Sequence, residues 1–331
     1  MKVSETGKVP AILAIILNWN NFQDSVKCIE SLLTCGYPYL TVIVVDNCST
    51  DDSLVRLKER FGQCTFVENE ENLGFARGCN RGIRRALEDE DCRYVLLLNN
   101  DAVLQPGALD SAVAAAESDA RIGLVGGKIL KSESSRQLWY AGGAVSRLRG
   151  QAKSRGFEEI DRGQYDCECD TQFVTAAMML IKREVLTSVG SLPEEYFFGV
   201  EEWDYSIAVR RAGFRLRYSP QFVGYHCGDG SHWNFDPKFV YNYYRNKLIF
   251  QEKYLSPVAF VLWRWLFVLY GKVVYPRKVS RTAIQYSFGR DVDFAGLRYA
   301  LDCALRDHRK TALDERQLML FASELKAKFH R

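Results

Sequence analysis

The chain has 331 residues, of which 47% are hydrophobic and 26% are charged. This composition is that of an ordinary globular protein and excludes collagen-like, low-complexity and intrinsically disordered classes. The length fits two domains, or one large α/β domain with an appended segment. The net charge of +3 at pH 7 does not by itself indicate an acidic or a basic partner.

The charge is distributed unevenly along the chain. Residues 236–331 contain 18 Lys and Arg but only 9 Asp and Glu, so this segment has a net charge of +9 and residues 1–235 have a net charge of −6. We therefore expect two domains, 1–235 and 236–331, with different roles.

The cysteines and the apolar runs indicate the cellular compartment in which the protein is expected. Ten cysteines occur without a CxxC pair, mostly in apolar contexts, which is typical of reduced, buried thiols. A zinc site built from Cys167, Cys169, His226 and Cys227 fits no common ligand spacing. The run at 11–17 is too short for the core of a signal peptide, and no stretch of about 18 uncharged apolar residues occurs. We expect a cytoplasmic protein without an ordinary transmembrane helix.

The first part of the chain alternates between two hydrophobic periods. Continuous apolar runs, typical of strands buried on both faces, occur at 11–17, 41–45, 65–67 and 94–98. Apolar residues at helical spacing predict helices over about 22–33, 54–61, 75–88 and 106–116. This alternation predicts an α/β fold with a mostly parallel, doubly wound sheet.

The later elements are less regular. The stretch 131–170 indicates loops and short strands, and 173–181 predicts another buried strand. A short helix is expected over 202–212, closed by Gly213, and a strand over 215–219.

Polar residues follow each of the four apolar runs. They are Asn18 and Asn20, then Asp46 and Asn47, then Glu68 and Asn69, then Asn99, Asn100 and Asp101. The carboxyl ends of parallel strands share one sheet edge, where ligands bind, although Asn and Asp are also common in ordinary loops. At such an edge Asp101 can hold Mg²⁺ or Mn²⁺ while diphosphate oxygens complete the coordination.

The helix expected after residue 74 carries three glycines on one face. Gly74, Gly78 and Gly82 are spaced four apart, and each glycine destabilises a helix by roughly 1 kcal/mol relative to alanine. Close approach of a ligand or of another backbone explains this pattern, and tight packing of the helix on the sheet explains it equally well.

A second acidic cluster comprises Glu201, Glu202 and Asp204, beside several aromatic residues. Acidic residues favour the first turn of a helix, which is one explanation of the cluster. The other is functional, because apolar surroundings and like charges raise the pKa of a carboxyl group toward that of a general base.

Several segments, taken in order, resemble family 2 glycosyltransferases. They are LNWNN, VVDNCSTDDS, ENLGFARGCNRGI, LLLNNDA, the AGG at 141–143, VTAAMMLIKREV, and FFGVEEWDYSIAVRRAGFRLRYSP followed by a histidine. Each segment alone is a weak signal, but the ordered set over residues 10–250 is specific. The subgroup that it most resembles makes bacterial surface polysaccharides and is of the rhamnosyltransferase type. The resemblance implies a GT-A fold, a nucleotide-diphosphate sugar donor and inversion at the anomeric carbon.

The resemblance also implies roles for individual residues. Asp46 would hold the pyrimidine base, and the nucleotide-sugar site would further include Asn18, Asn20, Asn47, Gly74, Arg77, Asn80, Asn99 and Asn100. Asp101 and His226 would bind Mn²⁺ or Mg²⁺, with Asn99 in place of the first Asp of the family's DxD motif. Glu202 stands where the family has its catalytic base, usually Asp, and Glu201 and Asp204 are the alternatives.

The implied reaction moves rhamnose or a similar sugar from a dTDP- or UDP-sugar to a hydroxyl group of a saccharide or lipid-linked oligosaccharide. Two alternatives remain open. One is an enzyme of the same donor class whose acceptor is a polyprenyl phosphate. The other is a relative that binds nucleotide or glycan without catalysing transfer.

The basic C-terminal part contains a strongly apolar stretch at 257–276. Arg264 and Lys272 interrupt it, which argues against a membrane span, and further basic residues follow up to Arg281. Tryptophan and tyrosine flanked by basic residues favour a membrane interface, so we expect peripheral attachment to the cytoplasmic face through 257–281. A helical subdomain or a homodimer interface is the alternative. Nucleic-acid binding is excluded, because the aromatic residues cluster with aliphatic ones and not along a basic groove.

Overall fold

The computed structural model describes residues 9–132, 134–226, 237–271, 294–309 and 315–329. The chain divides into two compact units. The first comprises Met1–Val145, Ala152–Glu194 and Glu201–Gly228, and the second comprises Ser146–Gln151, Glu195–Val200 and Asp229–Arg331. The second unit thus includes two short segments that precede the boundary expected at residue 235.

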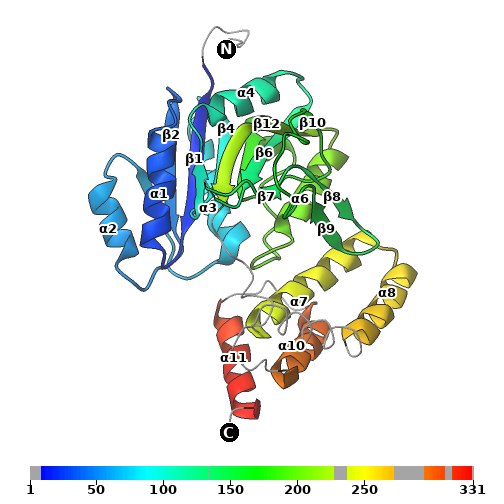
Figure 1. Cartoon of the computed structure of the whole chain (residues 1–331). Coiled ribbons are helices and arrows are strands. Elements are labelled where there is room, and N and C mark those ends of the chain that lie inside the picture. Colours follow the sequence, from blue (N-terminus) through cyan, green and yellow to red (C-terminus); the bar gives the residue numbers. More distant parts are fainter. Residues whose placement is uncertain (1–8, 133, 227–236, 272–293, 310–314, 330–331) are drawn as a thin grey trace. The chain divides into compact units, whose positions relative to one another are not determined.

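From β1 to β4 the strands and helices alternate as the hydrophobic periods predict, and β6 to β11 follow one another without a helix between them (Figure 1). The strands are β1 (Ala11–Asn18), β2 (Leu40–Asp46), β3 (Thr65–Glu68), β4 (Cys92–Asn99), β5 (Ala102–Leu104), β6 (Ile122–Leu130), β7 (Leu138–Tyr140), β8 (Gly143–Ser146), β9 (Gln151–Ser154), β10 (Cys169–Asp170), β11 (Met178–Lys182) and β12 (Arg215–His226). The helices are α1 (Phe22–Leu33), α2 (Ser53–Arg60), α3 (Gly74–Leu87), α4 (Ala108–Glu117), α5 (Arg183–Ser188) and α6 (Glu201–Arg211).

Ten of the described strands form one sheet, in the order β10-β12-β6-β11-β4-β1-β2-β3, with β5 paired to β12 and β7 to β6. Strands β1, β2, β3 and β4 pair in parallel, as do β6 and β12. Strand β11 lies antiparallel between β4 and β6. The expected α/β fold with a mostly parallel, doubly wound sheet is confirmed.

The sheet is buried on both faces, which explains its continuous apolar runs. On β1, Ile12 and Ile16 join one core with α1, α2 and α4, whereas Leu13 and Ile15 join the core on the other face with α3, α5 and α6. Successive side chains of a strand point to opposite faces, so a strand between two helical layers needs apolar residues at every position.

The strand register brings the polar residues that follow the runs to one edge of the sheet. Asn18 lies opposite Asp46, Asp46 lies opposite Glu68, and Leu17, next to Asn18, lies opposite Asn99. The expectation that these side chains share the carboxyl edge of the parallel strands is confirmed.

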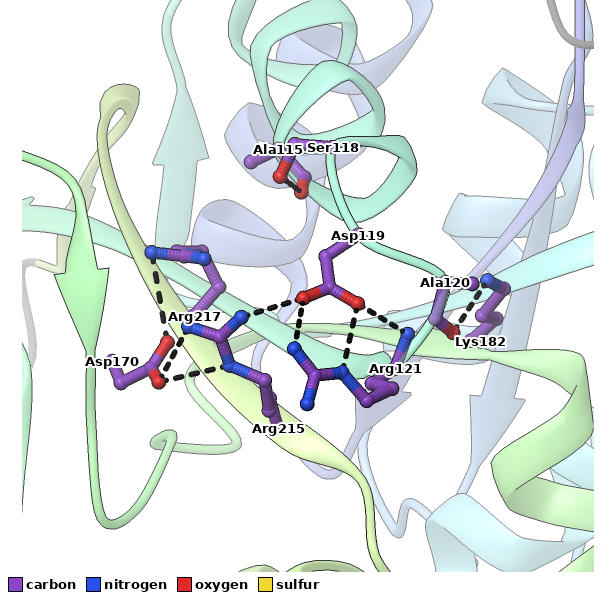
Figure 2. Close-up of polar contacts among 9 residues, drawn as sticks. All are labelled: Ala115, Ser118, Asp119, Ala120, Arg121, Asp170, Lys182, Arg215 and Arg217. Carbon is purple, nitrogen blue, oxygen red and sulfur yellow. Dashed lines mark hydrogen bonds and ion pairs between the residues drawn. The ribbon is translucent and has the colours of Figure 1, made fainter.

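The opposite edge is held by an ionic cluster that joins the starts of β6 and β12 (Figure 2). Arg215 contacts Asp119 at 2.6 Å and Asp170 at 2.7 Å, while Arg121 also binds Asp119 and Arg217 binds Asp170. The hydrogen bonds from Arg121, and then that from Arg215, hold the pKa of Asp119 well below its usual range. This cluster fixes the far end of the sheet and takes no part in the candidate site.

One strand is shorter than expected. The run at 173–181 predicts a strand throughout, but β11 begins only at Met178. The preceding N–H groups bind side chains of α6, since Val174 donates to Ser206 Oγ and Ala176 donates to Glu202. The strand expected at 215–219 extends, in contrast, to His226.

The second unit contains helices α7 (Pro237–Tyr254), α8 (Pro257–Leu269), α10 (Phe294–Asp307) and α11 (Glu315–Phe329). They enclose a separate apolar core that includes Leu248, Phe260, Phe267, Leu301 and Phe321. None of the helices in the described ranges combines the length and the apolar character needed to cross a bilayer.

Candidate active site

Asp101, Asn99 and His226 meet at the carboxyl edge of the sheet. Asn99 ends β4, Asp101 follows it, and His226 ends β12, where it pairs with Ala102 of β5. His226 Nε2 lies 3.2 Å from Asp101 Oδ1 and 3.1 Å from Asn99 Nδ2. The ring of Trp139 packs on the imidazole with centroids 4.6 Å apart. Two strands distant in sequence thus deliver the two predicted metal ligands to one place.

The polar atoms of this group are only partly satisfied within the protein. Burial raises the pKa of Asp101, but the hydrogen bond and charge of His226 outweigh this effect and leave that pKa below its ordinary value. Asn99 Oδ1 and His226 Nδ1 are buried and have no hydrogen-bond partner. Buried polar atoms nearly always have partners, so two such atoms without a partner, on two residues that contact each other, indicate a place where a ligand belongs.

The donor set suits a divalent cation that is completed by a ligand. Asp101 offers carboxylate oxygens, His226 offers a ring nitrogen, and Asn99 offers its unpartnered amide oxygen. Within the described residues no three His, Cys, Asp or Glu side chains converge to hold a metal alone. A cation here would take its remaining ligands from a bound diphosphate and from water.

Glu202 is held in a fixed orientation at the start of α6. Its Oε2 accepts a hydrogen bond of 2.9 Å from the hydroxyl of Thr175 and one of 2.7 Å from the backbone N–H of Ala176. Burial raises the pKa of Glu202 above its ordinary value, while hydrogen bonds from Ala176, Thr175 and Trp203 limit the rise. An oriented carboxylate with a raised pKa is suited to accept a proton.

Two adjacent residues connect Glu202 to the Asp101 group. Ala176 N donates to Glu202, and the adjacent Ala177 O accepts a 3.1 Å hydrogen bond from the backbone N–H of Asn99. The imidazole of His226 is also close enough to lower the pKa of Glu202. The two acidic centres, about 100 residues apart in sequence, therefore belong to one site.

The other two acids of the cluster are more deeply buried. Glu201 is 4% exposed and Asp204 is 1% exposed, whereas Glu202 is half-buried and thus the most accessible of the three. The residue before them, Val200, has a φ of 85°, which is strained for a β-branched residue. Accessibility favours Glu202 as the base, and its role, like those of Glu201 and Asp204, stays a prediction.

Asp46 and Asn18 form a buried network at the ends of β1 and β2. The Asp46 carboxylate accepts hydrogen bonds from Asn18 Nδ2 at 2.9 Å, from Ser49 Oγ at 2.6 Å and from Ser49 N at 2.8 Å. Asn18 is fully buried and also binds Ser25 and Ser53. These contacts fix the loop after β2, and the expected contacts with a nucleotide stay predictions.

Asn20, Asn47 and Asn100 support neighbouring loops in the same way. Asn20 has a φ of 51° and accepts a 2.7 Å hydrogen bond from Thr50 N. The Asn47 amide bridges the loop before α3, donating to Asn72 at 2.7 Å. Asn100 donates to Ser25 Oγ at 3.1 Å. The structure places all three at the predicted edge, and their contacts with a ligand remain untested.

The glycine face of α3 packs on the sheet. A Cβ at Gly78 would lie 2.7 Å from Leu17 Cδ1, and a Cβ at Gly82 would lie 2.6 Å from Ile15 Cγ2. Of the two explanations of these glycines, tight packing is therefore confirmed for Gly78 and Gly82. Gly74, with a φ of +75°, starts the helix in a left-handed conformation.

Arg77 and Asn80 lie on α3. Arg77 makes a long ion pair of 3.9 Å with Glu71. Asn80 is fully buried and anchors a distant loop, accepting a hydrogen bond from Leu192 N and donating to Leu192 O and Glu194 Oε1. Their expected contacts with a nucleotide stay predictions.

Sequence reasoning missed two contributors to the site. Thr175 orients Glu202, and Trp139 packs on His226. Neither stands in a spacing that predicts such a contact, because each meets its partner only through the fold.

The nine described cysteines are free thiols, and six of them are buried, as expected for reduced cysteines. Cys227, one of the four residues named above as a zinc site of uncommon spacing, lies outside the described residues. The other two cysteines of that group, Cys167 and Cys169, join no cluster of metal ligands in the part of the chain that the structure describes.

Comparison with solved structures shows the same fold in known glycosyltransferases. A structure described as GalNAc-T7 with UDP, GalNAc and Mn²⁺ superimposes with a TM-score of 0.58 at 14% identity, covering 97% of this chain and 58% of that chain. The mannosyltransferase PcManGT from Pyrobaculum calidifontis, in complex with GDP-Man and Mn²⁺, gives a TM-score of 0.52 at 17% identity, covering 97% and 88%. These likenesses show the GT-A fold that the sequence led us to expect.

Curated relatives are distant. An N-acetylglucosaminyl-diphospho-decaprenol L-rhamnosyltransferase of Mycobacterium tuberculosis is 24% identical over 197 residues, covering 55% of this chain and 64% of the relative, which is just under two thirds of its length. The low-salt glycan biosynthesis hexosyltransferase Agl10 of Haloferax volcanii is 21% identical over 252 residues, covering 73% and 76%. The family model described as glycosyl transferase family 2 matches residues 14–190, more than half of the chain. The chain therefore belongs to glycosyl transferase family 2.

Proposed function

We propose that the chain is an inverting glycosyltransferase that moves rhamnose or a similar sugar from a dTDP- or UDP-sugar to a hydroxyl group of a saccharide on a lipid carrier. One observation carries the proposal. The oriented carboxylate of Glu202 adjoins the Asp101–His226 pair, so a proton acceptor stands beside a place for a diphosphate and its cation.

The reaction is a single displacement. The oxygen of the acceptor hydroxyl forms a bond to the anomeric carbon, and the bond from that carbon to the diphosphate oxygen breaks. The bonding electron pair leaves with the nucleoside diphosphate, and Glu202 takes the hydroxyl proton. No covalent intermediate with the protein is needed, and the transition state has oxocarbenium character, as in glycoside hydrolysis.

Asp101 and His226 would hold a Mn²⁺ or Mg²⁺ ion, with Asn99 Oδ1 as the next donor. Such an ion neutralises charge on the leaving diphosphate as a Lewis acid. The Mn²⁺ in the descriptions of both structurally similar enzymes supports this assignment. Asp46, Asn18, Asn20, Asn47, Gly74, Arg77, Asn80 and Asn100 would shape the nucleotide-sugar site.

The domain assignment follows from the same proposal. Residues 1–235 would form the catalytic domain, and 236–331 would form an accessory helical extension. The name of one relative contains a diphospho-decaprenol acceptor and that of another contains glycan biosynthesis, which supports a glycan product and a lipid-linked acceptor. Such an acceptor is presented at a membrane, so we place the enzyme at the cytoplasmic face of the plasma membrane. Transfer to a polyprenyl phosphate is the second candidate.

The proposal is tested by incubating the purified protein with UDP-, dTDP- and GDP-sugars, with and without Mn²⁺, and measuring hydrolysis or transfer. In parallel, thermal melting is recorded with each nucleoside diphosphate. A ligand at about 100 times its Kd stabilises the fold by roughly 2.7 kcal/mol, which is a shift of several degrees. One pyrimidine diphosphate should give a Mn²⁺-dependent shift, and the matching sugar should be turned over.

Two variants separate catalysis from binding. Glu202→Gln should retain the nucleotide-induced shift but lose turnover by about 100-fold or more. The matched control Glu90→Gln, on an exposed turn, should behave as the wild type. If the wild type binds a nucleotide but turns over no sugar, the protein is better explained as a relative that binds nucleotide or glycan without catalysing transfer. No shift with any nucleotide in a folded sample would contradict the site itself.

A further inference from the structure

Helix α8 presents an apolar stripe to solvent. Six large hydrophobic side chains on it are between 53% and 73% exposed: Val258, Val261, Leu262, Trp265, Leu266 and Leu269. We call these six residues the α8 stripe. Their spacing of three and four residues places them on one face of a helix with 3.6 residues per turn.

The opposite face of α8 is the one that packs on the second unit. Phe260 and Phe267 are both 5% exposed and belong to its apolar core, and Trp263 packs against that core. The single charged residue of the helix, Arg264, donates a 3.3 Å hydrogen bond to the carbonyl of Leu305. Arg264 is exposed, but the six residues of the α8 stripe carry no charge, although an outward helix face is ordinarily polar.

This concentration of exposed apolar groups is specific to α8. Fifteen large hydrophobic side chains are exposed in the described residues, and six of them lie on these 13 helical residues. Isolated exposed hydrophobic residues are normal on a protein surface, but a contiguous group marks a place that another apolar body covers.

We propose that the α8 stripe inserts into the boundary between headgroups and acyl chains of an anionic lipid bilayer. A helix of 13 residues is about 20 Å long, too short to cross about 30 Å of hydrocarbon, but long enough to lie in the interface. Trp265 in the middle of the stripe suits this environment, because tryptophan is enriched at membrane interfaces. The insertion is that of an amphipathic helix whose apolar face is buried in lipid.

Charge favours a lipid surface over a second copy of the chain. Residues 236–331 carry a net charge of +9, so an anionic bilayer attracts this part of the protein. A symmetric contact through the stripe would instead bring two such segments together, and like charges in proximity oppose association. Residues 272–281, which follow α8 in sequence, lie outside the described residues and are not needed for the inference.

The inference rests on the proposed function in one respect only: insertion of the stripe would bring the enzyme to an acceptor carried by a lipid. Lipid binding itself is measured without any donor sugar. A protein that binds vesicles but turns over no sugar would contradict the proposed function and leave the membrane contact standing.

The test measures co-sedimentation of the full chain with vesicles of phosphatidylcholine alone and of phosphatidylcholine mixed with phosphatidylglycerol. The wild type should bind the anionic vesicles, and more weakly as salt is added. Leu262→Glu/Leu266→Glu should lower the partition coefficient by about 100-fold or more, since each inserted leucine contributes roughly tenfold. Val55→Glu/Leu148→Glu, at positions 59% and 74% exposed away from the stripe, is the matched control and should bind as the wild type.

A second measurement does not depend on the folding of the charged variant. Acyl chains brominated near the headgroups should quench the tryptophan fluorescence of the wild type, and Trp265→Phe should remove most of that quenching. Equal vesicle binding by the wild type and the Leu262→Glu/Leu266→Glu variant would overturn the inference. So would a wild type that is dimeric without lipid while this variant is monomeric, because the stripe would then cover a second copy.

Discussion

The replacement of Thr175 by valine tests whether the hydroxyl of this residue sets the protonation of Glu202. Thr175 is 2% exposed, and its Oγ1 donates a 2.9 Å hydrogen bond to Glu202 Oε2. Valine replaces the hydroxyl by a methyl group of similar size, so Ala176 N remains as a donor to the same oxygen. The change removes one hydrogen bond that favours the carboxylate form.

The expected size of the effect follows from the environment of Glu202. Hydrogen bonds to charged groups contribute about 1.5–3 kcal/mol, and the lower end applies because Glu202 is half-buried and water can replace part of the lost bond. A loss of about 1.5 kcal/mol reduces the ionisation constant of the carboxyl group roughly tenfold. The pKa of Glu202, already raised by burial, therefore moves further upward.

The assay is the pH dependence of kcat/KM for donor hydrolysis or transfer. A base must be ionised to act, so the acidic limb of the profile should move to higher pH in Thr175→Val, with a rate about tenfold lower on that limb and little change at the alkaline plateau. Thr175→Ser keeps the hydroxyl and should restore the wild-type profile. A uniform loss at every pH, or a profile that superimposes on the wild type, would refute the reasoning.

The remaining predictions concern stability and metal. The pKa of Glu202 is raised in the folded protein, so its protonated carboxyl group stabilises the fold below about pH 4.3, and this contribution is lost as the pH rises through the folded pKa. Glu202→Gln should therefore have a higher melting temperature than the wild type at neutral pH and lose this advantage in acid. A difference in melting temperature that is constant across pH would argue against this explanation. Asp101→Asn should abolish the Mn²⁺ dependence of the nucleotide-induced melting shift while leaving the metal-free melting temperature within a few degrees of wild type. Asn80→Ala should destabilise the fold by about 1–3 kcal/mol in denaturant titration, because it leaves both backbone groups of Leu192 without their partner. Gly82→Ala should destabilise by a net of about 1 kcal/mol, since overpacking against Ile15 and Val45 outweighs the gain in helix propensity, and a rise in melting temperature would contradict the packing explanation.

The sheet could be predicted because its signal is local. A strand buried on both faces needs apolar residues at every position, and β1, β2 and β4 show such runs directly in sequence. Parallel pairing then fixes the shared edge. This is why Asn18, Asp46 and Asn99 could be expected to lie near one another before any coordinates were known.

The contacts that give the edge its chemistry are not local. Residues 173–177 have the composition of a strand, but the N–H groups of Val174 and Ala176 bind side chains of α6, about 30 residues later in the chain. The ionic cluster around Arg215 likewise joins Asp119 and Asp170 from separate segments (Figure 2). Hydrophobic periodicity carries no information on such pairings, because it reports which face is buried and not which polar group lies opposite.

The short segment 175–177 connects the residue that we propose as the base to the residues that we propose as the diphosphate site. Ala176 N binds Glu202 and Ala177 O binds the backbone of Asn99, so adjacent residues connect the start of α6 to the end of β4. An attacking hydroxyl and a departing diphosphate must be held on opposite sides of one carbon within a fraction of an ångström. Hydrogen bonds of adjacent backbone groups just before β11 provide such a fixed spacing, whereas two long surface loops would not. Glu202 is one methylene longer than the Asp that is usual at this position. Its carboxylate is nevertheless held in place, because Thr175 and Ala176 both donate hydrogen bonds to it.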